Sequence, residues 1–474
     1  MSAIISSSCT YVFDSPGSDV DCGRRGQHHA LKETMIMDIT RLVTIVTILL
    51  LMGTQLSCKK DEPIEPHITG IALSVEDASC TEAWIKVSLL DASQPRTVGV
   101  QQDGQRVLTA QMTTTDSVFV VEGLLPRRTY SYVAQRLRDT SVIDVSSPVQ
   151  ATTMDTTSHE FSFSFDTLGV TSSALTGVVI LSDTLAFATG EVYLLDSVGH
   201  FDDTPYNALK YDGYRFQPFR IQFYTVCGQT NRTPYPTKSL LSLGSNDVWF
   251  AMDGDEIARW DGFAQRSTWC LPFSFGINNL WGKTITNVYA VGDGGNIAHY
   301  DGSVWHRIES GTAVSLNDVW GGTNRLVGEN VVVVAAGNKY TAGETKLLRI
   351  SSSGVVDTLP WSSQTLPRQS IWFDQHSKLY TCGGGVFSNN GKGWREAIGI
   401  PAIYTNRIRG NGDNDIVVAG DFGLLAHFNG WTWHVYTEVA MRLGNYESVA
   451  IKGNMMIAVG WIGDQGIIVR GVRH

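Results

Sequence analysis

The sequence predicts an all-β protein, and three observations carry this prediction. Charged residues make up only 17% of the chain, whereas it holds 47 Gly and 10% aromatic residues. Short apolar stretches end in Gly, Asn or Asp, the residues that tight turns need. A unit of similar sequence also recurs through the last two-thirds of the chain. At 474 residues the chain exceeds one ordinary core, so we expect two or more folded units.

Charge and motif content exclude several classes of function. The net charge of −10 argues against a nucleic-acid-binding protein, which would carry an excess of basic residues. The seven cysteines include no Cys-x-x-Cys pair and no cluster with His at ligand spacing, so we predict no metal site and no cofactor. The motifs of α/β-hydrolases, zinc proteases and P-loop enzymes do not occur. The sequence therefore singles out no catalytic residue.

The N-terminal region is typical of an export signal. Residues 42–53 form the one strongly apolar run, about a dozen residues that are too few to span a bilayer. Arg41 precedes this run, and the pair Ser57-Cys58 follows it. A small residue directly before a cysteine resembles the cleavage site of bacterial lipoproteins, although Gln55 stands where an aliphatic residue is more common. The resemblance implies that Cys58 anchors the chain by lipid to the outer membrane of a gram-negative bacterium, facing the cell exterior.

The segment boundaries follow from this signal. Residues 35–57 are expected to be the signal peptide and residues 58–67 a charged tether, which resembles the segment after the lipidated cysteine in gram-negative lipoproteins. Residues 1–34 place a polar stretch ahead of the signal, so we predict that they are a misassigned start or a disordered extension. A buried core helix over residues 42–53 is the alternative.

Short alternating stretches indicate a β-sandwich over residues 68–154. Side chains alternate faces along a strand, so Trp84, Tyr130 and Tyr132 can share one core. Residues 123–130, Gly-Leu-Leu-Pro-Arg-Arg-Thr-Tyr, resemble the tyrosine corner of fibronectin type III domains, in which the Tyr hydroxyl bonds back to the backbone upstream. The resemblance implies a fibronectin type III-like sandwich, which we expect to act as a spacer.

The repeat is the strongest signal in the chain. Residues 245–262, 286–305 and 414–433 share a pattern in which an apolar strand precedes a second strand that ends in Asp-Gly or Asn-Gly. The turn glycines lie at positions 213, 262, 302, 354, 391, 430 and 471, with a mean spacing of about 43 residues. This period is typical of four-stranded propeller blades, and the Asp-Gly or Asn-Gly turns need positive φ.

The units resemble the DVW-x-x-G … HYDG-x-x-W repeats of secreted bacterial proteins, which implies a seven-bladed β-propeller over residues 158–474. The last unit lacks a fourth strand, because the chain ends three residues after Gly471. Residues 161–165, Phe-Ser-Phe-Ser-Phe, alternate cleanly and belong to no unit. We therefore predict that they complete the last blade and close the ring.

Four residues at one position of the repeat are candidate ligand contacts. Trp281, Trp320 and Trp372 occupy this position on the first strand of a unit, and Arg409 takes it in a further unit. If the first strands line the channel, these side chains lie near its mouth, where pockets of closed β structures form. Planar aromatics beside polar groups suit sugar or peptide recognition. Packing between blades, as core, is the alternative.

Two other patterns favour structural roles. A basic residue recurs two places before the turn Asp or Asn, at Lys210, Arg259, His299 and His427, with Arg470 in a similar place. Regular spacing around a ring favours pairing with a neighbouring turn, or a solvated rim. Carboxylate pairs lie in turns at Asp253/Asp255 and Asp413/Asp415, where we expect turn hydrogen bonds, with calcium binding or acid–base chemistry as the alternative.

Cys227 and Cys270 are the candidate disulfide of an exported chain. Closing a loop of this size would stabilise the fold by about 4 kcal/mol in the chain-entropy model. Isolated buried thiols are the alternative.

Two classes of function stay open. The first is a non-catalytic surface lipoprotein that binds a glycan or a protein through the propeller face. The second is a secreted hydrolase or lyase that acts on polysaccharide or peptide at the propeller mouth. Because no enzyme motif occurs, the sequence favours the first.

Overall fold

The computed structural model describes residues 70–474 apart from 92–94, 337–344 and 361–367. Residues 68–474 form one compact unit. The predicted signal peptide, the tether and the lipid-bearing Cys58 lie outside the described residues. Within the described ranges, no helix combines the length and the hydropathy that a bilayer span requires.

Two antiparallel sheets form the N-terminal module. One has the strand order β1-β2-β5, and the other has the order β4-β3-β6-β7 with β8 beside β6. The strands are β1 (Ile71–Ala78), β2 (Glu82–Leu89), β3 (Thr97–Gln102), β4 (Gln105–Gln111), β5 (Asp116–Glu122), β6 (Thr129–Arg138), β7 (Ser141–Val145) and β8 (Val149–Thr152). Their inward side chains share one core that includes Ile85 and Tyr132, with Tyr130 packed against it, as expected. The expectation was wrong for Trp84, which alternates with Ile85 to the opposite face of β2 and lies outside this core. The Tyr130 hydroxyl accepts a hydrogen bond from the Leu125 N–H (2.9 Å), the bond that the tyrosine-corner pattern predicts.

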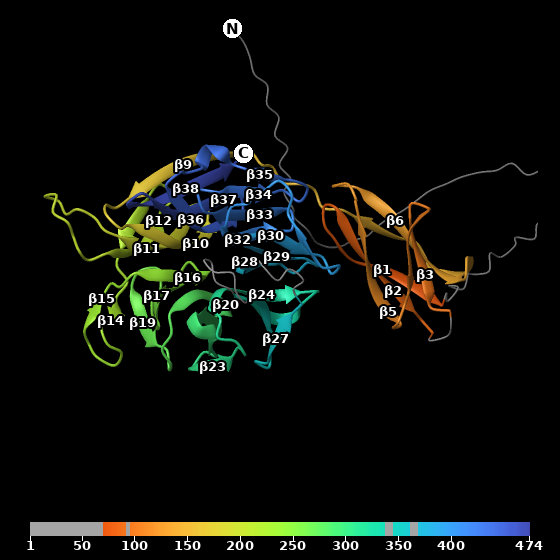
Figure 1. Cartoon of the computed structure of the whole chain (residues 1–474), viewed down its shortest axis with the longest axis horizontal. Coiled ribbons are helices and arrows are strands. Elements are labelled where there is room, and N and C mark those ends of the chain that lie inside the picture. Colours follow the sequence, from red (N-terminus) through yellow and green to blue (C-terminus); the bar gives the residue numbers. More distant parts are fainter. Residues whose placement is uncertain (1–69, 92–94, 337–344, 361–367) are drawn as a thin grey trace, which may run out of the picture. The chain divides into compact units, whose positions relative to one another are not determined.

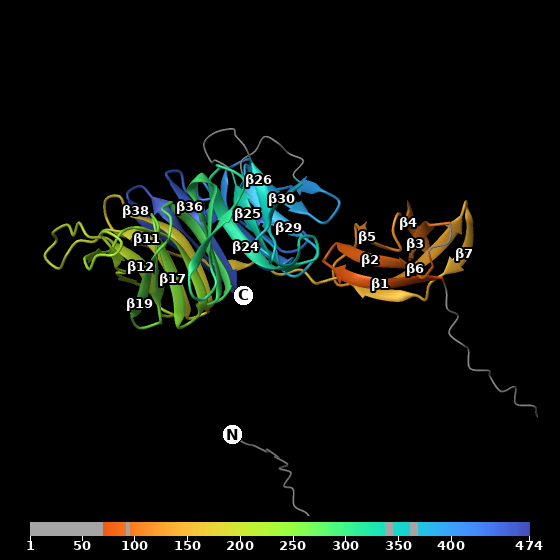
Figure 2. The same ribbon diagram turned by 90° about the horizontal axis from the view of Figure 1, so that it is seen from below.

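The remainder of the described chain is a β-propeller made of four-stranded antiparallel sheets. Seven such sheets occur in residues 161–474, gaps aside, and the strands follow in chain order in all but the last. The first strands contact one another in succession, and β36 contacts β10. The ring is therefore closed, so strands from opposite ends of the propeller sequence, such as β11 and β38, lie side by side (Figure 2).

The strands of the first four sheets are β10 (Ala174–Ser182), β11 (Leu185–Val192), β12 (Tyr206–Tyr211), β13 (Phe216–Phe219); β16 (Thr237–Gly244), β17 (Asp247–Met252), β18 (Glu256–Trp260), β19 (Gln265–Cys270); β20 (Ile277–Thr284), β21 (Asn287–Gly292), β22 (Asn296–Tyr300), β23 (Trp305–Glu309); and β24 (Leu316–Asn324), β25 (Gly328–Ala336), β26 (Lys346–Ile350), β27 (Val356–Leu359). The next three sheets contain β28 (Arg368–Trp372), β29 (Leu379–Gly383), β30 (Gly385–Asn389), β31 (Trp394–Glu396); β32 (Thr405–Gly412), β33 (Asp415–Gly420), β34 (Leu425–Phe428), β35 (Trp433–Val435); and β36 (Gly444–Lys452), β37 (Met455–Ile462), β38 (Gln465–Arg473), β9 (Phe161–Leu168). A separate ribbon pairs β14 (Phe223–Tyr224) with β15 (Arg232–Thr233), and two short 3₁₀ turns are η2 (Asp293–Gly295) and η3 (Thr437–Val439).

The strand β9 completes the last sheet. It pairs antiparallel with β38 from Leu168 opposite Gly466 to Phe161 opposite Arg473, which confirms the predicted pairing of residues 161–165 (Figure 1). Its alternating side chains place Phe161 and Phe163 against the core of this sheet. The strands from the two ends of the propeller sequence therefore close the ring by hydrogen bonds.

The predicted turn glycines adopt positive φ at six of seven positions. These positions are Gly213, Gly262, Gly302, Gly354, Gly391 and Gly430, with φ between 80° and 99°. The prediction was wrong for Gly471, which lies inside β38 opposite Phe163. Because β9 supplies the fourth strand of this sheet, no hairpin follows β38 and no turn glycine is required there.

Side chains of the sandwich contact turns of the propeller within the compact unit. Lys378 forms an ion pair with Glu82, and both side chains are about nine-tenths buried (8% and 12% exposed). His376 Nδ1 lies 2.8 Å from Asp77 Oδ1, and the Trp84 indole N–H donates to the Asn390 carbonyl (3.0 Å). Buried charges need partners, so this interface depends on both modules being present.

Candidate functional site

The first strand of every sheet carries a β-bulge at the same place. The register with the second strand shifts by one residue near the start of all seven first strands. The residues that follow the shift are Gly177, Ser239, Asn279, Asp318, Ser370, Arg407 and Ser448. A bulge bends its strand and re-aims the next side chain. Most of these re-aimed side chains are polar, which gives the centre of the ring its polar character.

Four of these side chains form a continuous hydrogen-bonded chain across neighbouring sheets. The Ser239 hydroxyl donates to Asn279 Oδ1 (2.6 Å), and the Asn279 amide donates to Asp318. On the other side, the Ser370 hydroxyl donates to Asp318 Oδ2. Because each link joins one first strand to the next, the chain fixes the spacing of β16, β20, β24 and β28 around the channel.

Asp318 is also the counterion of two arginines from β32. Its carboxylate is fully buried, 2.7 Å from Arg407 Nη1 and 2.9 Å from both terminal nitrogens of Arg409. Burial alone would raise the pKa of Asp318, but the two guanidinium groups hold it at about 2. The guanidinium of Arg409 lies 4.7 Å from the ring centroid of Trp320. This cluster is therefore a fixed cationic centre with one neutralising carboxylate.

A cavity of about 730 Å³ opens beside this cluster. Most of its wall comes from β10, β16, β20 and β36, and Trp320, Arg407 and Arg409 also line it. The volume lies within the range of roughly 300–1,000 Å³ that small ligands and peptide segments occupy. The indole of Trp281 forms part of the wall. The cavity thus combines aromatic, aliphatic and cationic surface at the centre of the propeller.

The structure separates the four predicted contact residues into two groups. Trp281, Trp320 and Arg409 line the cavity. Trp372 does not line it, and only 2% of the residue is exposed. Its ring packs so closely on Gly410 of the next sheet that an added Cβ there would lie 2.8 Å from it. For Trp372, packing between sheets is the role that the structure shows.

Sequence reasoning missed Asp318 and Arg407. Both residues carry a visible signal, since each stands two positions before a residue that was selected, Trp320 or Arg409. Side chains two apart on a strand share a face, so the same face that presents the aromatic position also presents the buried charges. The pairing itself was not visible, because Asp318 and Arg407 are 89 residues apart in the chain.

Three of the five recurring basic residues pair within their own sheets, whereas Arg470 on β38 donates to the Tyr211 hydroxyl on β12 of the neighbouring sheet. Arg259 forms an ion pair with Asp247, His299 Nε2 lies 2.9 Å from Asn287 Oδ1, and His427 Nε2 lies 2.8 Å from Asp415 Oδ1. Each partner is the first residue of the second strand in the same sheet, at β17, β21 and β33. These contacts tie the third strand to the start of the second, which is a structural role.

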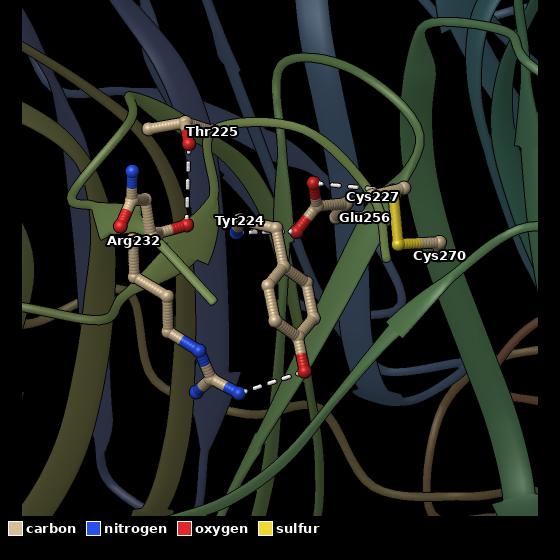
Figure 3. The surroundings of a disulfide bond; sticks show 7 residues. Tyr224, Thr225, Cys227, Arg232, Glu256 and Cys270 are labelled. Carbon is tan, nitrogen blue, oxygen red and sulfur yellow. Dashed lines mark hydrogen bonds between the residues drawn. A yellow bond between two sulfur atoms is a disulfide. The ribbon is translucent and has the colours of Figure 1, made fainter. Parts of the chain in front are cut away.

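Cys227 and Cys270 form a disulfide beside Glu256 (Figure 3). The Glu256 carboxylate accepts a hydrogen bond from the Tyr224 N–H (2.8 Å), and burial raises the pKa of Glu256. These two cysteines and Glu256 are the one group in the described residues whose ligand atoms approach closely enough to hold a metal ion. Since the sulfur atoms are bonded to each other, they are not thiolate ligands in this state.

The chain matches no protein-family model, and no curated protein sequence matches it. Solved structures with a similar fold include YCF48 bound to D1 peptide, at 13% identity and a TM-score of 0.48, covering 66% of this chain and 95% of that one. The WD40 β-propeller domain of Doa1 aligns at 14% identity and a TM-score of 0.44, covering 66% of this chain and 97% of that one. The computationally designed Ika8 protein aligns at 12% identity and a TM-score of 0.41, covering 64% of this chain and 98% of that one.

Proposed function

We propose that this chain is an exported, lipid-anchored binding protein whose ligand, a protein or a glycan, occupies the central cavity of a seven-bladed propeller. In this proposal Cys58 carries the anchor, and a fibronectin type III-like sandwich links the anchor to the propeller. The sequence pattern around Cys58 supports the anchor, and the Tyr130 hydrogen bond supports the sandwich assignment. The central cavity supports the binding function.

The single observation that carries the binding function is the composition of the cavity wall. Two indoles, Trp281 and Trp320, line the same cavity as Arg407 and Arg409, and the guanidinium of Arg409 lies 4.7 Å from the ring centroid of Trp320. Large, rigid aromatic side chains beside hydrogen-bond donors provide much of the binding energy at recognition sites. Arg409 is held in place by Asp318, so its donors are positioned before a ligand arrives.

The hydrolase or lyase alternative receives less support. Such a mechanism needs a general acid or base with a pKa near the working pH. The described residues that line the cavity comprise cations, hydroxyls, one amide, indoles and aliphatic groups, without Asp, Glu, His, Cys or Tyr. The nearby Asp318 has a pKa of about 2 and is saturated by its arginines. The wall is therefore suited to binding.

Replacing Trp281 with alanine tests the proposal. Trp281 is half-buried and lines the cavity, whereas the equally half-buried Trp269 lies outside it and serves as the matched control. Wild-type protein is screened on a glycan array and on an immobilised peptide library. We expect Trp281→Ala to weaken every specific interaction by about tenfold or more, and Trp269→Ala to leave it unchanged.

Thermal unfolding of both variants accompanies the binding measurements, so that loss of fold is not mistaken for loss of contact. The proposal fails if the wild type binds nothing on either array. It also fails if Trp281→Ala and Trp269→Ala bind alike.

A further inference from the structure

We infer that the cavity takes an acidic peptide segment, in which carboxylate side chains alternate with apolar ones. This inference rests on the proposed binding function and specifies its ligand class. Three features of the cavity support it: the charge of the wall, the groups that already neutralise part of this charge, and the apolar surface of the wall.

The cavity wall is strongly cationic. Five basic side chains line it, namely Lys238, Lys283, Arg407, Arg409 and Lys452. The described residues of the wall include no Asp and no Glu. The chain as a whole carries a net charge of −10, so the concentration of positive charge here runs against the composition. Such a concentration attracts anions and raises their rate of association.

Acidic side chains outside the cavity wall neutralise part of this positive charge. Asp318 is shared by Arg407 and Arg409, so one positive charge remains at the centre. Lys238 lies 3.4 Å from Asp253 in an exposed pair. Lys452 occupies an exposed position at the end of the strand β36. A ligand that brings carboxylates to the rim and to the centre would therefore meet positive charge at both places.

The charged and apolar groups of the wall together favour a peptide over a neutral glycan. A neutral glycan offers only hydroxyls and amides to the cations, whereas ionised carboxylates form stronger, charge-assisted hydrogen bonds with them. The one amide of the wall, Asn279, is already bonded to Ser239 and Asp318. The wall also contains the partly exposed aliphatic side chains of Leu181 and Leu243. Apolar peptide side chains can bury this surface while their acidic neighbours meet the cations.

Fluorescence anisotropy with two labelled peptides tests the ligand class. In the first peptide Glu alternates with Leu, and in the second Gln replaces every Glu. We expect the Glu peptide to bind the full chain and the Gln peptide to bind about tenfold more weakly or not at all. Affinity for the Glu peptide should fall as salt is added, because exposed lysines contribute through screened attraction.

Lysine-to-glutamine variants at the rim of the cavity test which positive charges contribute to peptide binding. Lys283→Gln and Lys452→Gln should each weaken binding of the Glu peptide by about threefold, and the double variant by about tenfold. Lys210→Gln is the matched control, because Lys210 lies on β12 outside the cavity wall. Neither rim lysine belongs to the buried Asp318 cluster, so the fold should be unaffected.

The outcomes separate this inference from the proposed function. If the Gln peptide binds as well as the Glu peptide, with affinity that still depends on Trp281, the binding function stands and the acidic ligand class is wrong. The acidic ligand class is also wrong if a glycan, but neither peptide, binds in a Trp281-dependent way. If Lys210→Gln loses as much affinity as Lys283→Gln, the attraction is non-specific and the inference is overturned. Absence of any binding overturns both.

Discussion

Asp318 determines the charge balance at the centre of the propeller. Its carboxylate is buried and ionised, since Arg409 and Arg407 outweigh the effect of burial and hold its pKa at about 2. It also accepts hydrogen bonds from Asn279 and Ser370 on the adjacent first strands. One residue thus positions the two arginines of the candidate site and links four sheets of the ring.

Asp318→Asn should be strongly destabilising. The substitution keeps the shape of the side chain but leaves Arg407 and Arg409 without a counterion in a buried setting. Breaking one partner of a buried ion pair costs about 3–5 kcal/mol, so we expect a loss of at least about 3 kcal/mol in the free energy of unfolding. Urea unfolding of purified protein at neutral pH measures it.

Asp253→Asn is the control for this prediction. Asp253 pairs with Lys238 on the surface, where its side chain is 62% exposed. Surface pairs contribute little, so its removal should change stability by less than about 1 kcal/mol. Equal losses for the two variants would show that Asp318 does not act as a buried counterion.

At the scale of elements, the closure of the ring depends on β9 and the residues around it. His159 lies just before β9, and its Nδ1 is 2.8 Å from Nδ1 of the buried His427 on β34. Asp415 on β33 binds both His427 and Arg473, which lies at the end of β38. The last sheet and the residue that precedes its closing strand are therefore joined to the neighbouring sheet by a small group of polar side chains.

We predict that acid weakens this closure. Burial, together with His427, His434 and Arg473, lowers the pKa of His159 from 6.5 to about 4. The folded state therefore resists protonation of His159 while the unfolded chain accepts it. Its contribution to stability is complete above about pH 6.5 and declines as the pH falls toward 4. Urea midpoints at about pH 7.5 and about pH 5 measure the decline.

The variant His159→Gln isolates this contribution. Glutamine keeps a donor and an acceptor but does not titrate, so the loss of stability on acidification should be smaller than in the wild type. Burial also lowers the pKa of His427 despite the adjacent Asp415, and this effect is retained in both proteins. An identical loss in wild type and variant would show that His159 does not contribute.

At the scale of the whole molecule, the proposed anchor makes Cys58 the point of attachment to the membrane. We predict that cells supplied with labelled palmitate incorporate label into the wild-type protein and not into Cys58→Ser. The reason is that the acylated thiol is absent from the variant. Mass spectrometry of the mature wild type should find no peptide from residues 1–57.

Cys80→Ser is the matched control for the labelling experiment, since Cys80 is a buried free cysteine of the sandwich and its hydrogen bond to the Asp155 carbonyl can be made by serine. This control should keep the label. Label retained by Cys58→Ser, or a mature N-terminus within residues 1–34, would contradict the lipoprotein proposal.

Features of the fold that depend on residues close together in the sequence were easier to predict than features that depend on distant residues. The turns at Gly262 and Gly302 were predictable, because positive φ is a local requirement that Asp-Gly satisfies. The pairing of β9 with β38 was also predictable. The last repeat unit lacked a fourth strand, and the alternating residues 161–165 belonged to no unit. Gly471 was mistaken for a turn because its spacing fits the repeat although the chain reaches its fourth strand by another route.

The candidate site was predictable only in part. The repeat placed Trp281, Trp320 and Arg409 at one position of the first strands, and all three line the cavity. It placed Trp372 at the same position, but this indole is buried against Gly410 of the next sheet and does not line the cavity. Trp281 packs on Gly321 in the same way, yet part of its side chain stays exposed and lines the cavity. How much of such an indole stays exposed to the channel depends on the side chains that surround it in space, which the repeat does not encode.

The sequence by itself determined the all-β class, the repeat length, the turns and the strand that closes the ring, because these depend on local conformation and on patterns along one chain. Only the tertiary structure decided which charges meet. Asp318 and Arg409 stand 91 residues apart, and their pairing depends on the ring bringing β24 and β32 to a common centre. Electrostatic interactions act over distances in space, so the cationic cavity and its proposed acidic ligand became visible only once the ring was closed.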